Sequence, residues 1–307
     1  MKFEAGAIDF DPPLGKTSPR TVRFPNGAKF YTEDSDKLDT LRGKYKVSFR
    51  NPQVLASLLE NHRQAIVISI LILAAFVFVA YKYGIPAVAD SVAKKVPRSV
   101  LETVSDNTLE TLDKYFGFAP SNLPEERRGE LLATFDQLIF EIGSPEYSYK
   151  LEFRDIPPNA FALPSGTIIF SDSLIEELVT EEAIIAVMAH EVAHVEERHG
   201  MRQVLRQAGV AFLVSTLLSD VSSLPAILSA LPELLISSGY SRSFESEADA
   251  YSADYLCHRY GSSQGMVDAL ERLQSLYGMA ESESTEFIST HPLLSKRIEM
   301  LEELGCE

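Results

Sequence analysis

The sequence predicts an α+β fold that is predominantly helical, with a small sheet, one membrane-spanning helix and a small β-rich N-terminal module. Three observations lead to this expectation. Residues 186–195 place two histidines at helical spacing in an apolar run, residues 65–80 form an uncharged apolar stretch, and residues 20–32 contain two short β-prone runs. The 307 residues are enough for one sizeable domain and an appendage.

The N-terminal residues 1–64 are expected to form the β-rich module. Arg20–Phe24 and Lys29–Thr32 favour strands, and the intervening Pro25-Asn26-Gly27 is typical of a hairpin turn. No cleavable signal peptide is expected, because Met1 is not followed by a basic and then an apolar segment. The composition of this module gives no indication of catalysis.

The apolar stretch is expected to cross a lipid bilayer once, as a transmembrane helix over residues 65–83. Residues 65–80 carry no charge, and Tyr81-Lys82-Tyr83 supply two interfacial tyrosines and a lysine that can reach the interface. A buried core helix is the alternative, but the absence of a polar stripe argues against it.

The orientation of the span is left open, because basic residues flank it in similar number on both sides. We expect a single-pass protein with its N-terminus inside. In a bacterium, the acidic C-terminal part would then lie in the periplasm, anchored to the inner membrane.

Residues 84–123 are expected to form a helical connector, and residues 124–307 the main domain. Within that domain the pattern predicts a helix over Glu125–Ile142 and strands within Tyr147–Phe153 and Asn159–Ser171.

A second apolar stretch, within residues 204–236, is interrupted by Asp220, Pro225 and Pro232 and is too short to span a bilayer comfortably. It predicts a lid, a membrane-contacting hairpin or plain core, and these alternatives stay open.

The run from His190 to His194 contains H-E-x-x-H and predicts a metal site. On a helix, residues four apart share nearly one face, so the two imidazoles can meet at one zinc ion. Glu191 is adjacent, where its carboxylate can take a proton from a water on the metal. Thr180 and Gly200 are expected to begin and end this helix.

The third metal ligand is expected from the segment 240–250. Glu245 and Asp249 are four residues apart and share one face of a second helix. Glu245 would complete a set of two histidines and one glutamate for one Zn²⁺ per chain, and Asp249 would accept a hydrogen bond from a ligand histidine. Glu247 points about 200° away on such a helix and is expected to be a solvated charge.

These motifs resemble the membrane-associated zinc endopeptidases that include HtpX and the CAAX prenyl endopeptidase, which are gluzincins. The run Asn159-Ala160-Phe161-Ala162-Leu163-Pro164 is similar to the strand pair before the family's zinc helix. Thr290-His291-Pro292 with Arg297-Ile298 is similar to its C-terminal signature. The resemblance covers about residues 159–301 and implies a zincin-type catalytic domain. The single span resembles the bacterial single-span type more than multi-span HtpX.

We therefore expect a membrane-anchored zinc metalloendopeptidase that hydrolyses proteins or peptides in membrane or envelope protein quality control. The strand formed by Asn159, Ala160, Phe161 and Ala162 would bind an extended substrate by main-chain pairing.

An oxyanion partner is also expected, with His291 as first choice and Arg242 and Tyr240 behind it. Alternatively, His291 takes the open zinc position and holds the enzyme latent.

Composition bounds the remaining possibilities. The 28 Lys+Arg against 44 Asp+Glu argue against nucleic acid as a partner. Two cysteines, Cys257 and Cys306, predict neither a disulfide framework nor a cysteine-based zinc site.

The alternative function is a membrane-bound binding protein or holdase with a latent or vestigial protease site, and the complete set of motif residues argues against it. The physiological substrate and the oligomeric state are left open.

Overall fold

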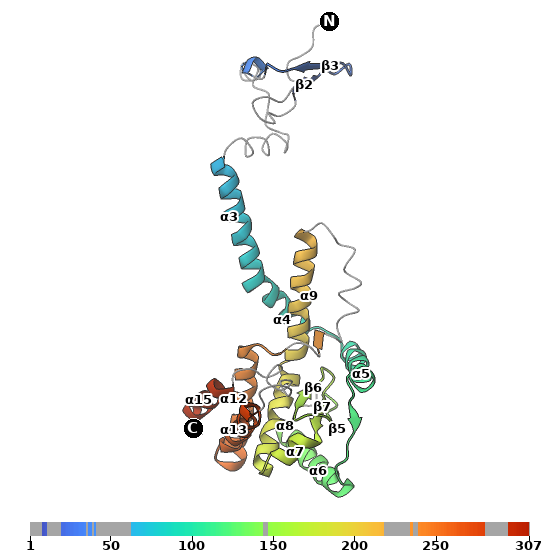
Figure 1. The fold of residues 1–307 in the computed structure, drawn as a ribbon, viewed down its shortest axis with the longest axis vertical. Helices are drawn as coiled ribbons and strands as arrows, with labels where there is room; N and C mark the ends of the chain where they lie inside the picture. Colours follow the sequence, from blue (N-terminus) through green and yellow to red (C-terminus); the bar gives the residue numbers. More distant parts are fainter. Residues whose placement is uncertain are drawn as a thin grey trace. The chain divides into compact units, whose positions relative to one another are not determined.

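The computed structural model describes residues 8–10, 20–34, 36–38, 40, 63–143, 147–217, 234–235, 239–279 and 294–306. They belong to two compact units, Met1–Ala80 and Tyr81–Glu307 (Figure 1). Most of the described residues are helical, and two small sheets accompany them. The predicted fold class is therefore confirmed.

The first unit contains a three-stranded antiparallel sheet. Its strands β1 (Asp9–Phe10), β2 (Arg20–Arg23) and β3 (Lys29–Thr32) lie in that order. The turn between β2 and β3 is held by Asn26, whose side chain accepts a hydrogen bond from the Ala28 amide at 3.1 Å. The next residue is a glycine with φ of 84°. The expected hairpin is present, and β1 is a strand that the sequence pattern did not predict.

A long apolar helix follows. Helix α3 (Arg63–Val79) continues through a π-helical turn, η2 (Ala80–Gly84), into α4 (Ile85–Ala93). By length and composition the helix over 66–93 could cross a membrane, and none of its most apolar window is buried. The helix extends ten residues beyond the predicted end at residue 83, and Pro86, near the start of α4, does not end it. The π-helical turn lies just before this proline, which removes a backbone hydrogen-bond donor.

The second unit places a four-stranded sheet among helices. The strand order is β4-β5-β7-β6, with β5 and β7 parallel and β6 antiparallel to β7. The strand bounds are β4 Ala119–Pro120, β5 Lys150–Asp155, β6 Ala160–Ala162 and β7 Thr167–Ser171. The helix bounds are α5 Arg98–Tyr115, α6 Glu125–Ile142, α7 Asp172–Glu177, α8 Glu181–Glu196, α9 His199–Leu217, α12 Arg242–Tyr260, α13 Gln264–Met279 and α15 Leu294–Leu304.

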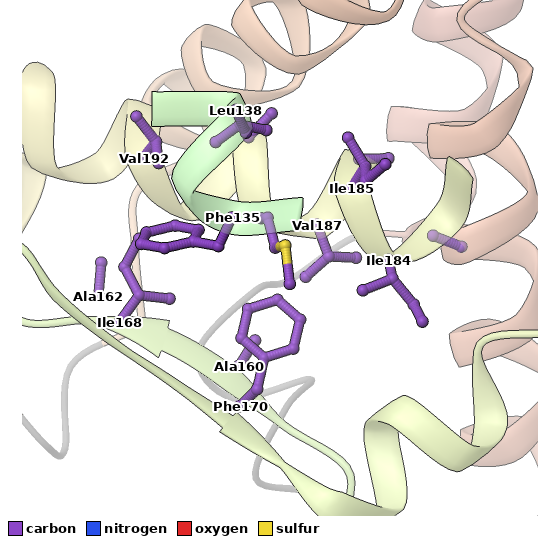
Figure 2. Close-up of a cluster of buried hydrophobic side chains, with 14 of the residues drawn as sticks. Phe135, Leu138, Ala160, Ala162, Ile168, Phe170, Ile184, Ile185, Val187 and Val192 are labelled. Carbon is purple, nitrogen blue, oxygen red and sulfur yellow. The ribbon is translucent and has the colours of Figure 1, made fainter. Parts of the chain in front are cut away.

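Helix α8 is the centre of this unit, and every residue from Ala183 to Val195 is buried. The sheet and α6 cover one side, and α12 and α13 cover the other (Figure 1). Figure 2 shows Phe135 of α6, Phe170 of β7 and Val187 of α8 in one cluster of buried side chains, with the Phe135 ring beside Ile168. Small and β-branched side chains all round α8 allow neighbours on every face, as expected of a helix that is buried on all sides.

The predicted start of α8 is confirmed and its predicted end is wrong. The Thr180 hydroxyl caps the helix by accepting a hydrogen bond from the Ala183 amide at 3.1 Å. The helix ends at Glu196, before the expected Gly200, which lies inside α9.

The break between α8 and α9 lies at Arg198, which takes a left-handed φ of 53°. Its guanidinium donates to the Tyr147 hydroxyl at 2.9 Å and to the Ala93 carbonyl at 2.7 Å. These tertiary bonds offset the cost of an unusual φ at a residue other than glycine. A sequence pattern based on glycine therefore missed the break.

One disulfide joins Cys257 of α12 to Cys306, just beyond α15, with 5.4 Å between the two Cα atoms. The sequence predicted no disulfide framework, and it did not predict this single bridge. The two cysteines are 49 residues apart, and only the packing of α15 against α12 and α13 brings them together. The bridge therefore fixes the C-terminal helix to α12.

Candidate active site

The proposed metal ligands meet where α8 faces α12. One ligand atom from each of His190, His194 and Glu245 lies within 4.8 Å of the other two, and all three residues are buried. The Nε2 atoms of the two histidines are 3.0 Å apart, and Glu245 Oε1 lies 3.5 Å from His194 Nε2. The structure thus brings together the three residues that the spacing of the motifs selected.

Local structure positions Glu245 toward α8. The Ser241 hydroxyl caps α12 by accepting a hydrogen bond from the Phe244 amide at 3.4 Å, which places Glu245 in the first turn. Further along α12, the Ser252 hydroxyl donates to the Ala186 carbonyl of α8 at 2.7 Å. This bond connects α12 to α8 about two turns beyond Glu245.

Asp249 lies behind His190. Its Oδ1 is 3.0 Å from His190 Nδ1, the nitrogen on the far side of the ring from Glu245. Arg297 of α15 donates to both Asp249 oxygens, at 2.6 and 2.7 Å, and its Nη1 is 2.6 Å from Glu245 Oε2. Burial alone would raise the pKa of Asp249, but the Arg297 charge and the hydrogen bonds from Arg297 and His190 lower it to about 2. Asp249 is therefore an ionised acceptor.

His194 has a different partner on its far side. Its Nδ1 lies 2.9 Å from Nδ1 of His199, and His199 Nε2 lies 3.0 Å from Oε2 of Glu247. Burial, together with the nearby Arg202 charge, lowers the pKa of His199 to about 4, although the hydrogen bond to Glu247 raises it. Glu247, expected to be a solvated charge, is half-exposed and also bonded to Arg202 at 3.4 Å.

This set of donors fits a divalent metal ion. Each histidine has a polar neighbour at Nδ1, so both Nε2 lone pairs are available on the side where they face each other. Two imidazoles and one carboxylate are a ligand set of catalytic zinc sites, which keep a further position for water or substrate.

Comparison with known proteins agrees with this geometry. Residues 125–305, which include the whole site, match Peptidase family M48. This chain belongs to peptidase family M48. It is accordingly a metalloendopeptidase that acts on proteins.

Several curated proteins of this kind are similar to the chain. Metalloprotease LoiP of Escherichia coli (strain K12) is 30% identical over 202 residues, which are 64% of this chain and 77% of LoiP. Mitochondrial metalloendopeptidase OMA1 of Schizosaccharomyces pombe is 27% identical over 172 residues, 54% of this chain and 50% of that protein. The β-barrel assembly-enhancing protease of Yersinia pestis is 28% identical over 152 residues, 46% of this chain and 31% of that protein. The chain thus spans half or less of the last two relatives.

Two further residues lie beside the proposed ligands, one in the sequence and one by ring stacking. Glu191 is fully buried on α8, next to His190. Tyr240 stacks its ring on His194, with 3.9 Å between centroids and 12° between planes. Burial raises the pKa of the Tyr240 hydroxyl well above its usual value, and the charges of Glu191 and Glu245 add to the effect. Tyr240 therefore stays a hydrogen-bond donor at neutral pH.

The other candidates for an oxyanion partner are placed less favourably or lie outside the described residues. Arg242 is exposed on the first turn of α12. His291 falls outside the residues that the structure describes, so its two alternative roles stay predictions.

The predicted substrate strand, β6, is an edge strand of the described sheet and packs on α8. Asn159 accepts from the Ser171 amide at 2.9 Å, and the Leu163 amide donates to the Thr167 carbonyl at 2.8 Å. Because such bonds recur at every second residue of an antiparallel pair, Phe161 also faces β7. The main-chain groups of Ala160 and Ala162 consequently point away from β7, toward the edge.

Sequence patterns did not assign a role to Arg297 or to His199. Arg297 was part of the C-terminal signature, yet its contact with Asp249 joins residues 48 positions apart. His199 lies five residues after His194, a spacing that a continuous helix would place on another face. In both cases a tertiary contact, rather than local periodicity, puts the residue at the site.

Proposed function

We propose that the chain is a membrane-anchored zinc endopeptidase in which His190, His194 and Glu245 hold the metal. The convergence of their donor atoms within 4.8 Å in a buried setting carries this proposal. Two histidines and a glutamate with an adjacent glutamate match the ligands and general base that zinc peptidases need. We also propose that the chain belongs to the narrower HtpX-like and CAAX prenyl endopeptidase-type group, in its bacterial single-span form. This assignment rests on the sequence motifs alone.

In the proposed reaction, the bound ion supplies Lewis acidity toward water and a carbonyl oxygen. Glu191 takes the proton of the attacking water and passes it to the leaving amine nitrogen. Asp249 keeps a proton on His190 Nδ1, so that Nε2 retains the lone pair a metal needs. The Tyr240 hydroxyl, which stays protonated, donates a hydrogen bond to the developing oxyanion. His291 is the other proposed donor for this oxyanion.

Glu191→Gln tests the general base. The amide has nearly the shape of the carboxylate but cannot take a proton, so we expect hydrolysis of casein to fall by about 10²–10⁴-fold. Metal content per chain, measured by mass spectrometry, should stay at the wild-type value. Glu181→Gln, at the exposed start of the same helix, is the matched control and should leave the rate unchanged. Casein cleavage by Glu191→Gln at the wild-type rate would contradict the role of Glu191 as general base. Casein hydrolysis by the wild type that a chelator does not inhibit would contradict a metal-dependent mechanism.

We further propose that an extended peptide pairs with β6 through the main chain of Ala160 and Ala162. The main-chain groups of these two residues point away from β7, and such groups recognise backbone rather than side chains. Such recognition tolerates many sequences. Ala160 is 0% and Ala162 8% exposed, so the edge of β6 must open before a peptide can pair with it.

Peptide substrates methylated at single backbone amides test this pairing. Methylation of the alternate amides that face β6 should lower kcat/KM roughly fivefold each, since one hydrogen bond is worth about 1 kcal/mol. Methylation of the intervening amides should have a small effect. A loss that shows no alternation along the peptide would contradict pairing with β6.

We also propose that the protein crosses a bacterial inner membrane once, with the catalytic unit in the periplasm. The apolar helix over 66–93 supports a span, and the bridge between Cys257 and Cys306 supports an oxidising compartment. Protein substrates of the membrane or envelope would then be within reach, in keeping with the named role of the β-barrel assembly-enhancing relative.

Thiol trapping in growing cells tests this localisation. Both cysteines should resist a maleimide reagent after acid quenching and react once a reductant is added. Two free thiols without reduction would place the catalytic unit in a reducing compartment and contradict the proposal.

A further inference from the structure

The far side of His194 begins a chain of hydrogen bonds that the proposed reaction leaves without a role. His194 Nδ1 is 2.9 Å from His199 Nδ1, and His199 Nε2 is 3.0 Å from Glu247 Oε2. The chain runs from α8 to α9 and then to α12. It ends on a carboxylate that is half-exposed.

The acceptor at the end of this chain fixes every proton along it. An ionised carboxylate only accepts, so His199 Nε2 must carry the hydrogen toward Glu247. A neutral imidazole has one N–H, and His199 Nδ1 is therefore an acceptor. The hydrogen between the two rings must then lie on His194 Nδ1. His194 Nε2 is left with its lone pair, on the side that faces His190 and Glu245.

We propose that His199 and Glu247 are positioning residues that set the tautomer and ring orientation of His194 for the metal ion. This inference rests on the proposed role of His194 as a ligand. Each histidine then has its own partner at Nδ1. For His190 the partner is the Asp249 carboxylate, and for His194 it is the His199 imidazole, which is bonded in turn to Glu247.

Packing holds the His199 ring in place. The ring is fully buried and stacks on Phe244, with 4.2 Å between centroids and 18° between planes. Arg202 lies over the same Phe244 ring at 4.4 Å and donates to Glu247. Arg202 is held in turn by Asp90 of α4 at 3.0 Å. The ring that meets His194 therefore has little freedom to turn.

The left-handed residue Arg198 makes the contact possible. On an uninterrupted helix, five residues advance about 140° beyond a full turn, so His199 would face away from His194. The break at Arg198, φ 53°, redirects the chain so that His199 starts a new helix with its ring against His194. The unusual backbone conformation thus has a consequence at the metal site.

The test compares two substitutions of His199 in the full-length protein. His199→Phe keeps a ring to stack on Phe244 but removes both nitrogens, and His199→Asn keeps a polar group close to the position of Nδ1. The Zn²⁺ dissociation constant, the visible absorption spectrum of the Co²⁺ form, kcat and KM are measured for each. His258→Phe, on an exposed position of α12, is the matched control.

We expect His199→Phe to weaken Zn²⁺ binding about 10–100-fold, as for other residues that support a metal ligand. The Co²⁺ spectrum should shift, and kcat should fall more than KM changes. His199→Asn should restore most of the affinity and spectrum, and His258→Phe should match the wild type. Wild-type affinity and spectrum in His199→Phe would overturn the inference.

Two further variants keep the outcome decisive. Glu247→Leu removes the terminal acceptor at a half-exposed position and should weaken Zn²⁺ about tenfold. If His199→Phe does not fold, an unchanged affinity and Co²⁺ spectrum in Glu247→Leu overturns the inference. His194→Ala should abolish binding. If His194→Ala still binds Zn²⁺, the proposed metal site is wrong. If His194→Ala loses Zn²⁺ while His199→Phe and Glu247→Leu keep the wild-type Zn²⁺ affinity, only the positioning role is wrong.

Discussion

Buried charge between α8 and α12 is the constraint on which the catalytic unit depends. Glu191, Glu245 and Asp249 are each at most 1% exposed, and Arg297 brings a buried positive charge against the last two. Removing one partner of a buried ion pair typically costs about 3–5 kcal/mol. Three carboxylates around one guanidinium still leave an excess of negative charge, which a divalent cation can balance. The interface therefore favours a bound metal for electrostatic reasons as well as for its geometry.

This constraint explains why the C-terminal helix belongs to the site. Helix α15 delivers Arg297 to Asp249 and Glu245, and the bridge between Cys257 and Cys306 fixes its end to α12. A catalytic interface whose charge balance comes from the last helix of the described chain is complete only when that helix is docked. The histidines of α8 are supported from two directions, by α12 with α15 for His190 and by α9 for His194.

The sequence predicts the local part of this arrangement well. Helical periodicity and capping suffice to locate the α8 cap at Thr180, the facing pair His190 and His194, and the placement of Glu245 with Asp249 on one face. Each of these depends on residues within one or two turns. The contacts of Arg297, the bridge to Cys306 and the pairing of His199 with Glu247 depend on how helices dock, which no single segment encodes. The left-handed Arg198 was missed for the same reason, because distant carbonyls stabilise it.

The central claim is that His190, His194 and Glu245 bind one zinc ion. Anomalous diffraction recorded on both sides of the zinc absorption edge, from crystals of the protein purified without added metal, tests it most directly. The account predicts one peak per chain, about 2.0–2.2 Å from an imidazole nitrogen of each histidine and from a Glu245 oxygen. A peak bound by other residues, or no peak at this site in zinc-soaked crystals, would contradict it.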